Sequence, residues 1–276
     1  MVAAASLVAG SAGAQAWRVI DASRQLRDTT AMSVHVDYAA GRLEVKPTAG
    51  PSMYELHMRY NAERSEPVTR YDSAMHALSI GIRSHGMRLT RGNGEGGTLH
   101  AELSTRVPMG LSFELGAVEA DLQLGGLRLT DLAVKSGAAD VTLRFDQPNL
   151  DRVRTLALEV VAATTKVVRA GNSGVERVRA NIGAGALDLD LSGELTHDVE
   201  VSATLGLGSF TLRVPSDMGV TVDASTFLAD FEKNGLVKRG DRWYSLGFDE
   251  AKRHVRVRVK AFLGEFNLVR EVRDAR

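Results

Sequence analysis

The chain has 276 residues, which is long enough to bury a sizeable hydrophobic core. Its 34 basic and 34 acidic residues give a formal net charge of +0, so no global field attracts nucleic acid or an anionic membrane. The sequence contains no cysteine, which excludes disulfides and thiolate chemistry within it. Aromatic residues make up only 5%, a composition that favours a core of aliphatic layers over a large compact enzyme.

Residues 1–16 are small, apolar and uncharged, and they end in Ala14-Gln15-Ala16. This Ala-x-Ala pattern is a signal-peptidase site and predicts a signal peptide over 1–16, with Trp17 as the first mature residue. The stretch is too short and too weakly apolar to span a membrane, and we expect no transmembrane segment in the mature chain. The predicted location is therefore periplasmic or extracellular.

Residues 17–30 are polar and predict an entry segment. Residues 31–110 predict strands joined by longer loops, beginning with the clean alternation of Met32 to Tyr38. Gly92, Gly94 and Gly97 satisfy the G-x-G-x-x-G pattern of dinucleotide sites, which requires a helix directly after it. The following residues 99–103 alternate like a strand instead. We therefore interpret the glycines as a loop and expect no cofactor.

A repeat dominates the rest of the chain. Apolar alternation begins at Leu111, Leu132, Leu156, Val178, Val199 and Val220, in steps of 21 to 24 residues. A second series with the same period begins at Leu122, Val141, Thr165, Leu187 and Phe210. Two interleaved series with one period predict a single all-β domain, a parallel β-helix-like β-solenoid with about two strands per coil. A β-sandwich remains the alternative.

Glycines recur in one form, Gly-x-apolar-polar-apolar, starting at Gly41, Gly185, Gly208 and Gly264. Glycine permits positive φ and close backbone approach, so these positions predict tight corners between strands. We expect 17–110 to be the N-terminal part of the domain and 111–276 to be the solenoid with a C-terminal cap.

The pattern breaks over residues 223–250, which contain Trp243 and Tyr244. These aromatic residues predict either a cap over the end of the solenoid or an interface. Two last strands, 255–259 and 266–269, are expected to close the domain. The first of these strands is expected to turn Arg256 and Arg258 outward. We therefore treat Trp243, Tyr244, Arg256 and Arg258 as a candidate interaction patch. The alternative is a solvated strand face, or a sheet edge that its charges protect against aggregation.

Residues 207–222, Trp243-Tyr244 and 261–269 resemble the C-terminal domain of LiaF-like cell-envelope proteins. Residues 34–45 and 54–72 resemble the N-terminal part of the related toast-rack domains, in the DUF4097 and DUF2154 group. The resemblance implies an exported bacterial β-solenoid with no known catalytic residues. It also implies a link to the envelope-stress response, in which LiaF-like proteins act.

Asp121, Asp140, Asp188 and Asp190 occur at corresponding places in the second series of strands. Stacked coils would bring some of these carboxylates to one face, and two carboxyls 5–10 Å apart suffice for glycoside hydrolysis. These residues therefore form a candidate ligand face for a carbohydrate-active or carbohydrate-binding protein. The other interpretation is a wet strand face.

The seven histidines show no short metal-ligand spacing, and we predict no metal site. The serine-hydrolase motif G-x-S-x-G, the metalloprotease motif H-E-x-x-H and the P-loop do not occur either. The leading hypothesis is a non-enzymatic, exported binding or structural module of the bacterial envelope. Its expected partner is a protein or another envelope component, and not nucleic acid.

Overall fold

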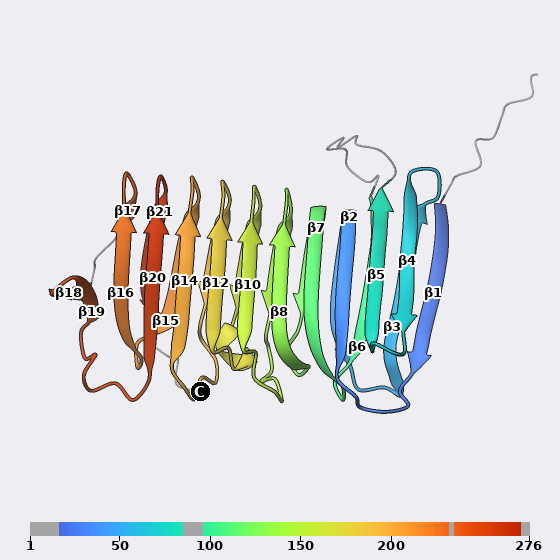
Figure 1. Cartoon of the computed structure of the whole chain (residues 1–276), viewed down its shortest axis with the longest axis horizontal. Coiled ribbons are helices and arrows are strands. Elements are labelled where there is room, and N and C mark those ends of the chain that lie inside the picture. The colour runs from blue at the N-terminus through green and yellow to red at the C-terminus, as the bar shows by residue number, and fades with distance from the viewer. Residues whose placement is uncertain (1–16, 85–95, 232–234, 272–276) are drawn as a thin grey trace, which may run out of the picture.

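A computed structural model describes residues 17–84, 96–231 and 235–271. In this part of the chain, the 3₁₀ turn η1 (Ala170–Ser173) is the one helical segment, and nearly everything else is strand or tight loop (Figure 1). The all-β solenoid prediction is confirmed. The predicted signal peptide, and Gly92 and Gly94 of the glycine-rich motif, lie outside the described residues.

The first strands are β1 (Trp17–Gln25), β2 (Met32–Thr48), β3 (Ser52–Asn61), β4 (Ser65–Asp72), β5 (Ala77–Ser84), β6 (Gly97–Ser104) and β7 (Pro108–Gln123). The middle strands are β8 (Arg128–Ser136), β9 (Asp140–Arg144), β10 (Thr155–Val160), β11 (Thr164–Val168), β12 (Arg177–Ile182), β13 (Ala186–Asp190), β14 (Val199–Leu205) and β15 (Ser209–Pro215). The last strands are β16 (Gly219–Thr226), β17 (Asp230–Phe231), β18 (Leu236–Arg239), β19 (Arg242–Ser245), β20 (His254–Ala261) and β21 (Glu265–Glu271).

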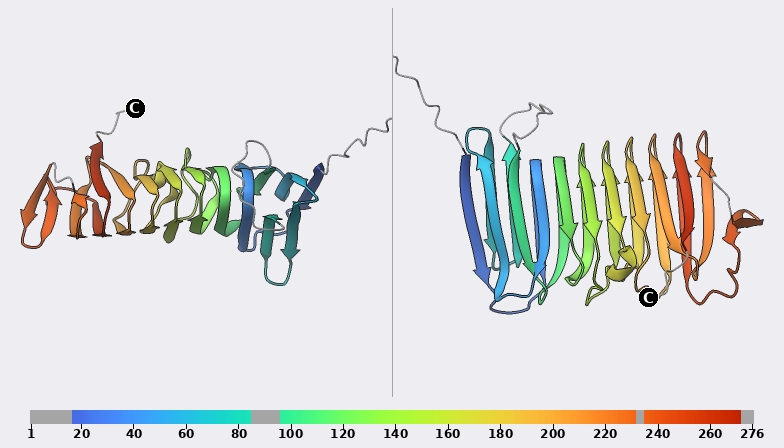
Figure 2. Two further views of the ribbon diagram at one scale, coloured as in Figure 1. Left: turned by 90° about the horizontal axis from the view of Figure 1, so that it is seen from above. Right: turned by 180° about the vertical axis from the view of Figure 1, so that it is seen from behind.

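Each coil contributes one strand to each of two facing sheets. Sheet I runs in the order β4, β5, β2, β7, β8, β10, β12, β14, β20, β16, β19 and β18. Sheet II runs in the order β1, β3, β6, β2, β7, β9, β11, β13, β15, β21 and β17. The long strands β2 and β7 belong to both sheets, because each bends from one sheet into the other. The coils line up along one axis and give an elongated molecule (Figure 2).

The core lies between the two sheets and is built of inward-facing rows. In sheet I, Leu132, Leu156 and Val178 lie side by side, as the repeat predicts. The next residue in this row is Val201, not the predicted Val199, so the sequence-based alignment slips by two residues here. A shift of two keeps every side chain on its face, which is why alternation alone did not reveal the slip.

At the N-terminal end the coils do not follow chain order. Strand β2 lies directly beside β7, and the later strands β5 and β6 lie on its other side. The antiparallel strands β1, β3 and β4 then cover this end. Because β7 spans Pro108–Gln123, the hydrogen-bonded sheets continue without a break across residue 110.

The C-terminal end also departs from chain order, and here the structure corrects a prediction. Strand β20 lies between β14 and β16, so Val255 separates Val199 from Val220. Strand β21 likewise lies between β15 and β17. The strands expected to close the domain are therefore an inserted coil. The hairpin β18–β19 packs antiparallel on the outer edge of β16 and forms the true end (Figure 1).

Asn172, in η1, connects three successive coils on the edge where sheet II returns to sheet I. Its side-chain amide donates to the Phe145 carbonyl at 2.7 Å, and its side-chain oxygen accepts from the Glu194 amide at 2.9 Å. Asn172 is buried, so these bonds satisfy groups that solvent does not reach.

Candidate interaction surfaces

The four aspartates of the predicted ligand face all lie on sheet II at outward positions. Asp121 and Asp188 share one row, but Thr142 and Lys166 lie between them. Adjacent strands are about 4.8 Å apart, so the two residues are separated by about 14 Å along the sheet. Asp140 is a diagonal neighbour of Asp121 in the next row. The structure thus brings Asp121 and Asp140 near each other and leaves the other pair farther along the sheet.

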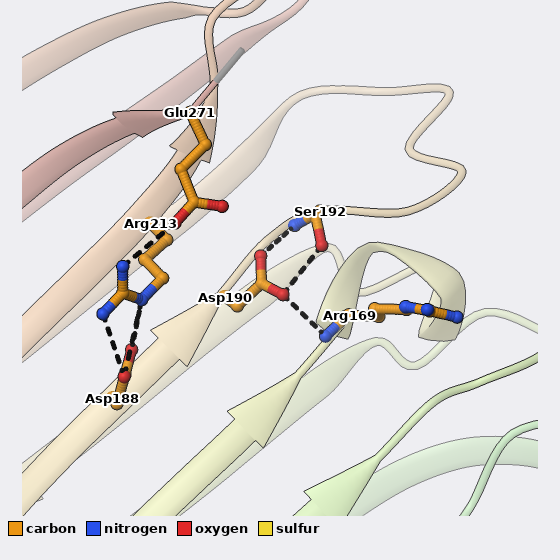
Figure 3. A network of polar contacts seen from close by, with 6 residues as sticks. All are labelled: Arg169, Asp188, Asp190, Ser192, Arg213 and Glu271. Atoms are coloured by element: carbon orange, nitrogen blue, oxygen red, sulfur yellow. Dashed lines mark hydrogen bonds and ion pairs between the residues drawn. The ribbon is translucent and has the colours of Figure 1, made fainter. Parts of the chain in front are cut away.

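Three of the four carboxylates are engaged by neighbouring groups. Asp121 pairs with Arg144 of the next coil at 3.3 Å. Asp188 pairs with Arg213 at 3.0 Å, and Arg213 also reaches Glu271 at 2.9 Å (Figure 3). The hydrogen bond to Asp188, and to a smaller extent that to Glu271, raises the pKa of Arg213 above its usual value. These pairs join one coil to the next.

Asp190 has a different environment. It accepts hydrogen bonds from the backbone amide and hydroxyl of Ser192, both at 2.7 Å, and from the backbone amide of Arg169 at 3.1 Å (Figure 3). Arg169 has the left-handed conformation, with φ of 55°, where the chain enters η1. Asp190 therefore holds two loops in place, whereas Asp140 is exposed on the sheet surface.

Trp243 and Tyr244 lie in the terminal hairpin. Trp243 packs edge-on against Phe231 at a ring-centroid distance of 6.3 Å and contacts the buried core. Tyr244 packs edge-on against Phe248 at 5.0 Å. Trp243 thus covers the C-terminal end of the core. Without such a cover, the apolar side chains of the last coil would be exposed to solvent.

Arg256 and Arg258 line a shallow groove on sheet I, together with Arg242 from β19. Glu200 and Asp223 line the same groove. Arg256 pairs with Asp198 at 2.9 Å. Of the predicted patch, the structure therefore brings the two arginines together and places the two aromatic residues in the adjoining hairpin. Arg242 is a groove residue that the sequence did not reveal.

Sequence reasoning also missed an apolar ridge on the loops that lead from sheet I to sheet II. These loops form the upper edge in Figure 1. The ridge consists of Leu207, Phe227, Leu228, Phe262 and Leu263. The two phenylalanine rings stack at 5.2 Å with an interplanar angle of 10°, although Phe227 is 69% and Phe262 is 58% exposed.

Backbone hydrogen bonds hold the ridge loops in register. The Phe227 amide donates to Ala261 O at 3.0 Å, and the Phe262 amide donates to Leu205 O at 3.0 Å. Beside the ridge, corner residues such as Ala162, Gly185 and Gly208 line a depression along the same edge. A signal was present in the sequence: Leu207 and Leu263 directly precede corner glycines, and Phe262, directly after Ala261, interrupts the polar–apolar alternation.

The surroundings of the ridge carry both signs of charge. Arg258 and Lys260 lie outward on β20, just before the Phe262 loop, and Glu265 follows that loop on β21.

In residues 17–84, 96–231 and 235–271, no helix is long and apolar enough to cross a membrane.

Comparisons with known proteins give one family model and several solved structures. A family model described as the N-terminal domain of toast_rack, DUF2154, matches residues 14–155. A candidate cell adhesion protein from Clostridium sporogenes aligns at 14% identity and a TM-score of 0.45, covering 92% of this chain and 100% of that one. A candidate adhesin from Bacteroides fragilis aligns at 12% identity and a TM-score of 0.45, covering 91% and 97%. The comparison with curated proteins gives no match.

Proposed function

This chain belongs to the toast-rack family of DUF2154, and we propose that it is a non-enzymatic, exported envelope module that binds a protein partner along its apolar ridge. The ridge is the observation that carries the proposal. Contiguous exposed apolar side chains on a folded protein mark interaction sites, and aromatic residues dominate the energy of such sites. The stacked loops hold Phe227 and Phe262 in a fixed arrangement, which lowers the entropy lost on binding.

A protein fits this surface better than a lipid bilayer. The ridge has an apolar centre with arginine, lysine and glutamate around it, which is the composition of a protein interface with a polar rim. Binding to an anionic membrane would require a rim of mainly positive charges. The rim here is mixed, and the whole chain has a net charge of +0. The groove that contains Arg256 and Arg258 lies on sheet I and also carries both signs of charge, since Glu200 and Asp223 line it as well.

The aspartate face supports a structural role more than a carbohydrate-active one. Asp121, Asp188 and Asp190 already engage arginines or backbone amides, and these contacts stabilise the stacking of coils. Neither the groove that contains Arg256 and Arg258 nor the depression beside the ridge is lined by these aspartates.

Site-specific photocrosslinking tests the docking proposal. A photoreactive amino acid in place of Leu207, in the full chain inside the source cells, should give one discrete protein adduct identifiable by mass spectrometry. The adduct should disappear when Phe227 and Phe262 are both changed to serine. Val19, an apolar residue 55% exposed on β1, is the matched control and should give no adduct. Equal labelling from Val19, or adducts to lipid or to a second copy, would contradict the proposal.

Export and the envelope-stress link belong to the same proposal. Ala14-Gln15-Ala16 supports cleavage before Trp17, so the intact mass of protein from the envelope fraction should correspond to a chain that begins at Trp17. A mass that still includes residues 1–16 would overturn the assignment of a cleaved signal peptide. The envelope-stress link requires that the crosslinked partner be a membrane-bound signalling protein.

A further inference from the structure

A row of ionisable side chains crosses sheet II at its N-terminal end. Asp21 on β1 lies opposite His57 on β3, and His57 lies opposite His100 on β6. Glu44 on β2 then lies opposite His100. The two imidazoles are thus cross-strand neighbours between two carboxylates, with ring centroids 6.3 Å apart.

Each imidazole is oriented by its own carboxylate. Nδ1 of His57 lies 2.6 Å from Asp21, and Nδ1 of His100 lies 2.7 Å from Glu44. An ionised carboxylate only accepts hydrogen bonds, so both Nδ1 atoms carry the proton and the neutral rings keep a lone pair on Nε2. The carboxylate engages Nδ1 of each ring, so Nε2 is the nitrogen left to bind a metal ion, and the pairing of β3 with β6 makes the two rings cross-strand neighbours.

This is the arrangement that proteins use for metal-binding histidines. A ligating imidazole commonly donates its second N–H to a carboxylate, which fixes the tautomer and raises the basicity of the metal-binding nitrogen. A second cross-strand pair, Glu55 and Glu102, lies two residues away and lines the same surface depression as the histidines. Carboxylate oxygens are therefore available beside the two imidazoles.

We propose that His57 and His100 bind a late first-row divalent metal ion, such as Zn²⁺ or Cu²⁺, through their Nε2 atoms. Imidazole ligands suit these ions, and affinity rises along the series toward Cu²⁺. Among the described residues, no three His, Asp or Glu side chains are already gathered around one point. The prearranged ligands are accordingly the two imidazoles, with water or the neighbouring carboxylate of Glu102 completing the coordination. The side chains of His57 and His100 are about half exposed, so the ion enters directly from solvent.

Calorimetric titration of the untagged full chain with ZnCl₂, and separately with CuCl₂, tests the site. We expect saturable binding of about one ion per chain, and at least a tenfold weaker affinity in His57→Ala and in His100→Ala. Asp21→Asn and Glu44→Gln remove the orienting carboxylates and should weaken binding about 10- to 100-fold; Glu44→Gln also removes the ion pair of Glu44 with Lys46.

His35→Ala is the matched control, since His35 lies on sheet I and its Nδ1 contacts the Ser112 hydroxyl at 2.9 Å instead of a carboxylate. It should leave the affinity unchanged. Thermal melts followed by circular dichroism verify that every variant is folded. We expect them all to fold, because the His57 and His100 side chains are about half exposed. Absence of saturable binding in the unaltered chain, or equal affinity in the double variant His57→Ala/His100→Ala, would overturn the proposal, as would an equal loss in His35→Ala.

Discussion

Replacing Gly41 with alanine should lower the free energy of unfolding by about 3 kcal/mol or more. Gly41 lies where β2 bends from sheet I into sheet II, and its φ is 122°, a conformation that residues with a Cβ rarely adopt. A Cβ placed there would lie 2.1 Å from the carbonyl oxygen and 2.8 Å from the nitrogen of Gly97 on β6. Both contacts are to backbone, so the chain must shift to relieve them.

Gly110→Ala on β7 is the matched control, because a Cβ at that position meets nothing within 4 Å. It should change the stability by no more than about 0.5 kcal/mol. Urea unfolding followed by tryptophan fluorescence measures both variants, since Trp17 lies on β1 at the same end of the solenoid. Similar midpoints for the two variants would show that the Gly41 corner tolerates a side chain.

Replacing Phe210 with alanine should cost about 3–5 kcal/mol. Phe210 is fully buried and stacks on Phe266 of the inserted coil at 5.4 Å. Phe266 in turn stacks on Phe231 at 5.2 Å, so the three rings form a column that joins the last coils. Removing the Phe210 ring leaves a cavity beside Phe266. The cavity cannot close, because backbone hydrogen bonds hold the surrounding strands in place.

Phe262→Ala is the corresponding control on the surface. Its ring is 58% exposed, so its removal should change the stability by no more than about 1 kcal/mol. Fluorescence of Trp243, which packs against Phe231, reports unfolding of this end in both variants. A loss at Phe262 as large as at Phe210 would assign the ridge to the stability of the fold and not to partner binding.

Much of the architecture could be predicted from the sequence because its causes are local. Alternation such as that of Leu132 to Val134 assigns one face of each strand to the core, and the common period of the two series predicts equal coils. Glycines at the corners follow from backbone conformation and close approach, as at Gly41. The outward positions of the four aspartates follow from the same alternation.

The partners of outward side chains could not be predicted, because they depend on register between strands far apart in sequence. His57 and His100 are separated by a long stretch that includes β4 and β5, and only the antiparallel pairing of β3 with β6 brings them together. The same holds for Arg213, which joins Asp188 to Glu271. The ridge likewise depends on the neighbouring loops of Phe227 and Phe262, which belong to coils placed out of chain order.

An all-β solenoid with about two strands per coil, apolar residues inward and glycines at its corners follows from the amino-acid pattern alone. The order of the coils, including the insertion of β20 and β21 between earlier strands, emerges only in the folded chain. Every coil presents similar aliphatic rows and the same unpaired backbone groups at its edges. Local pattern cannot distinguish among such edges, and the order is set by long-range contacts such as the phenylalanine column and the terminal hairpin.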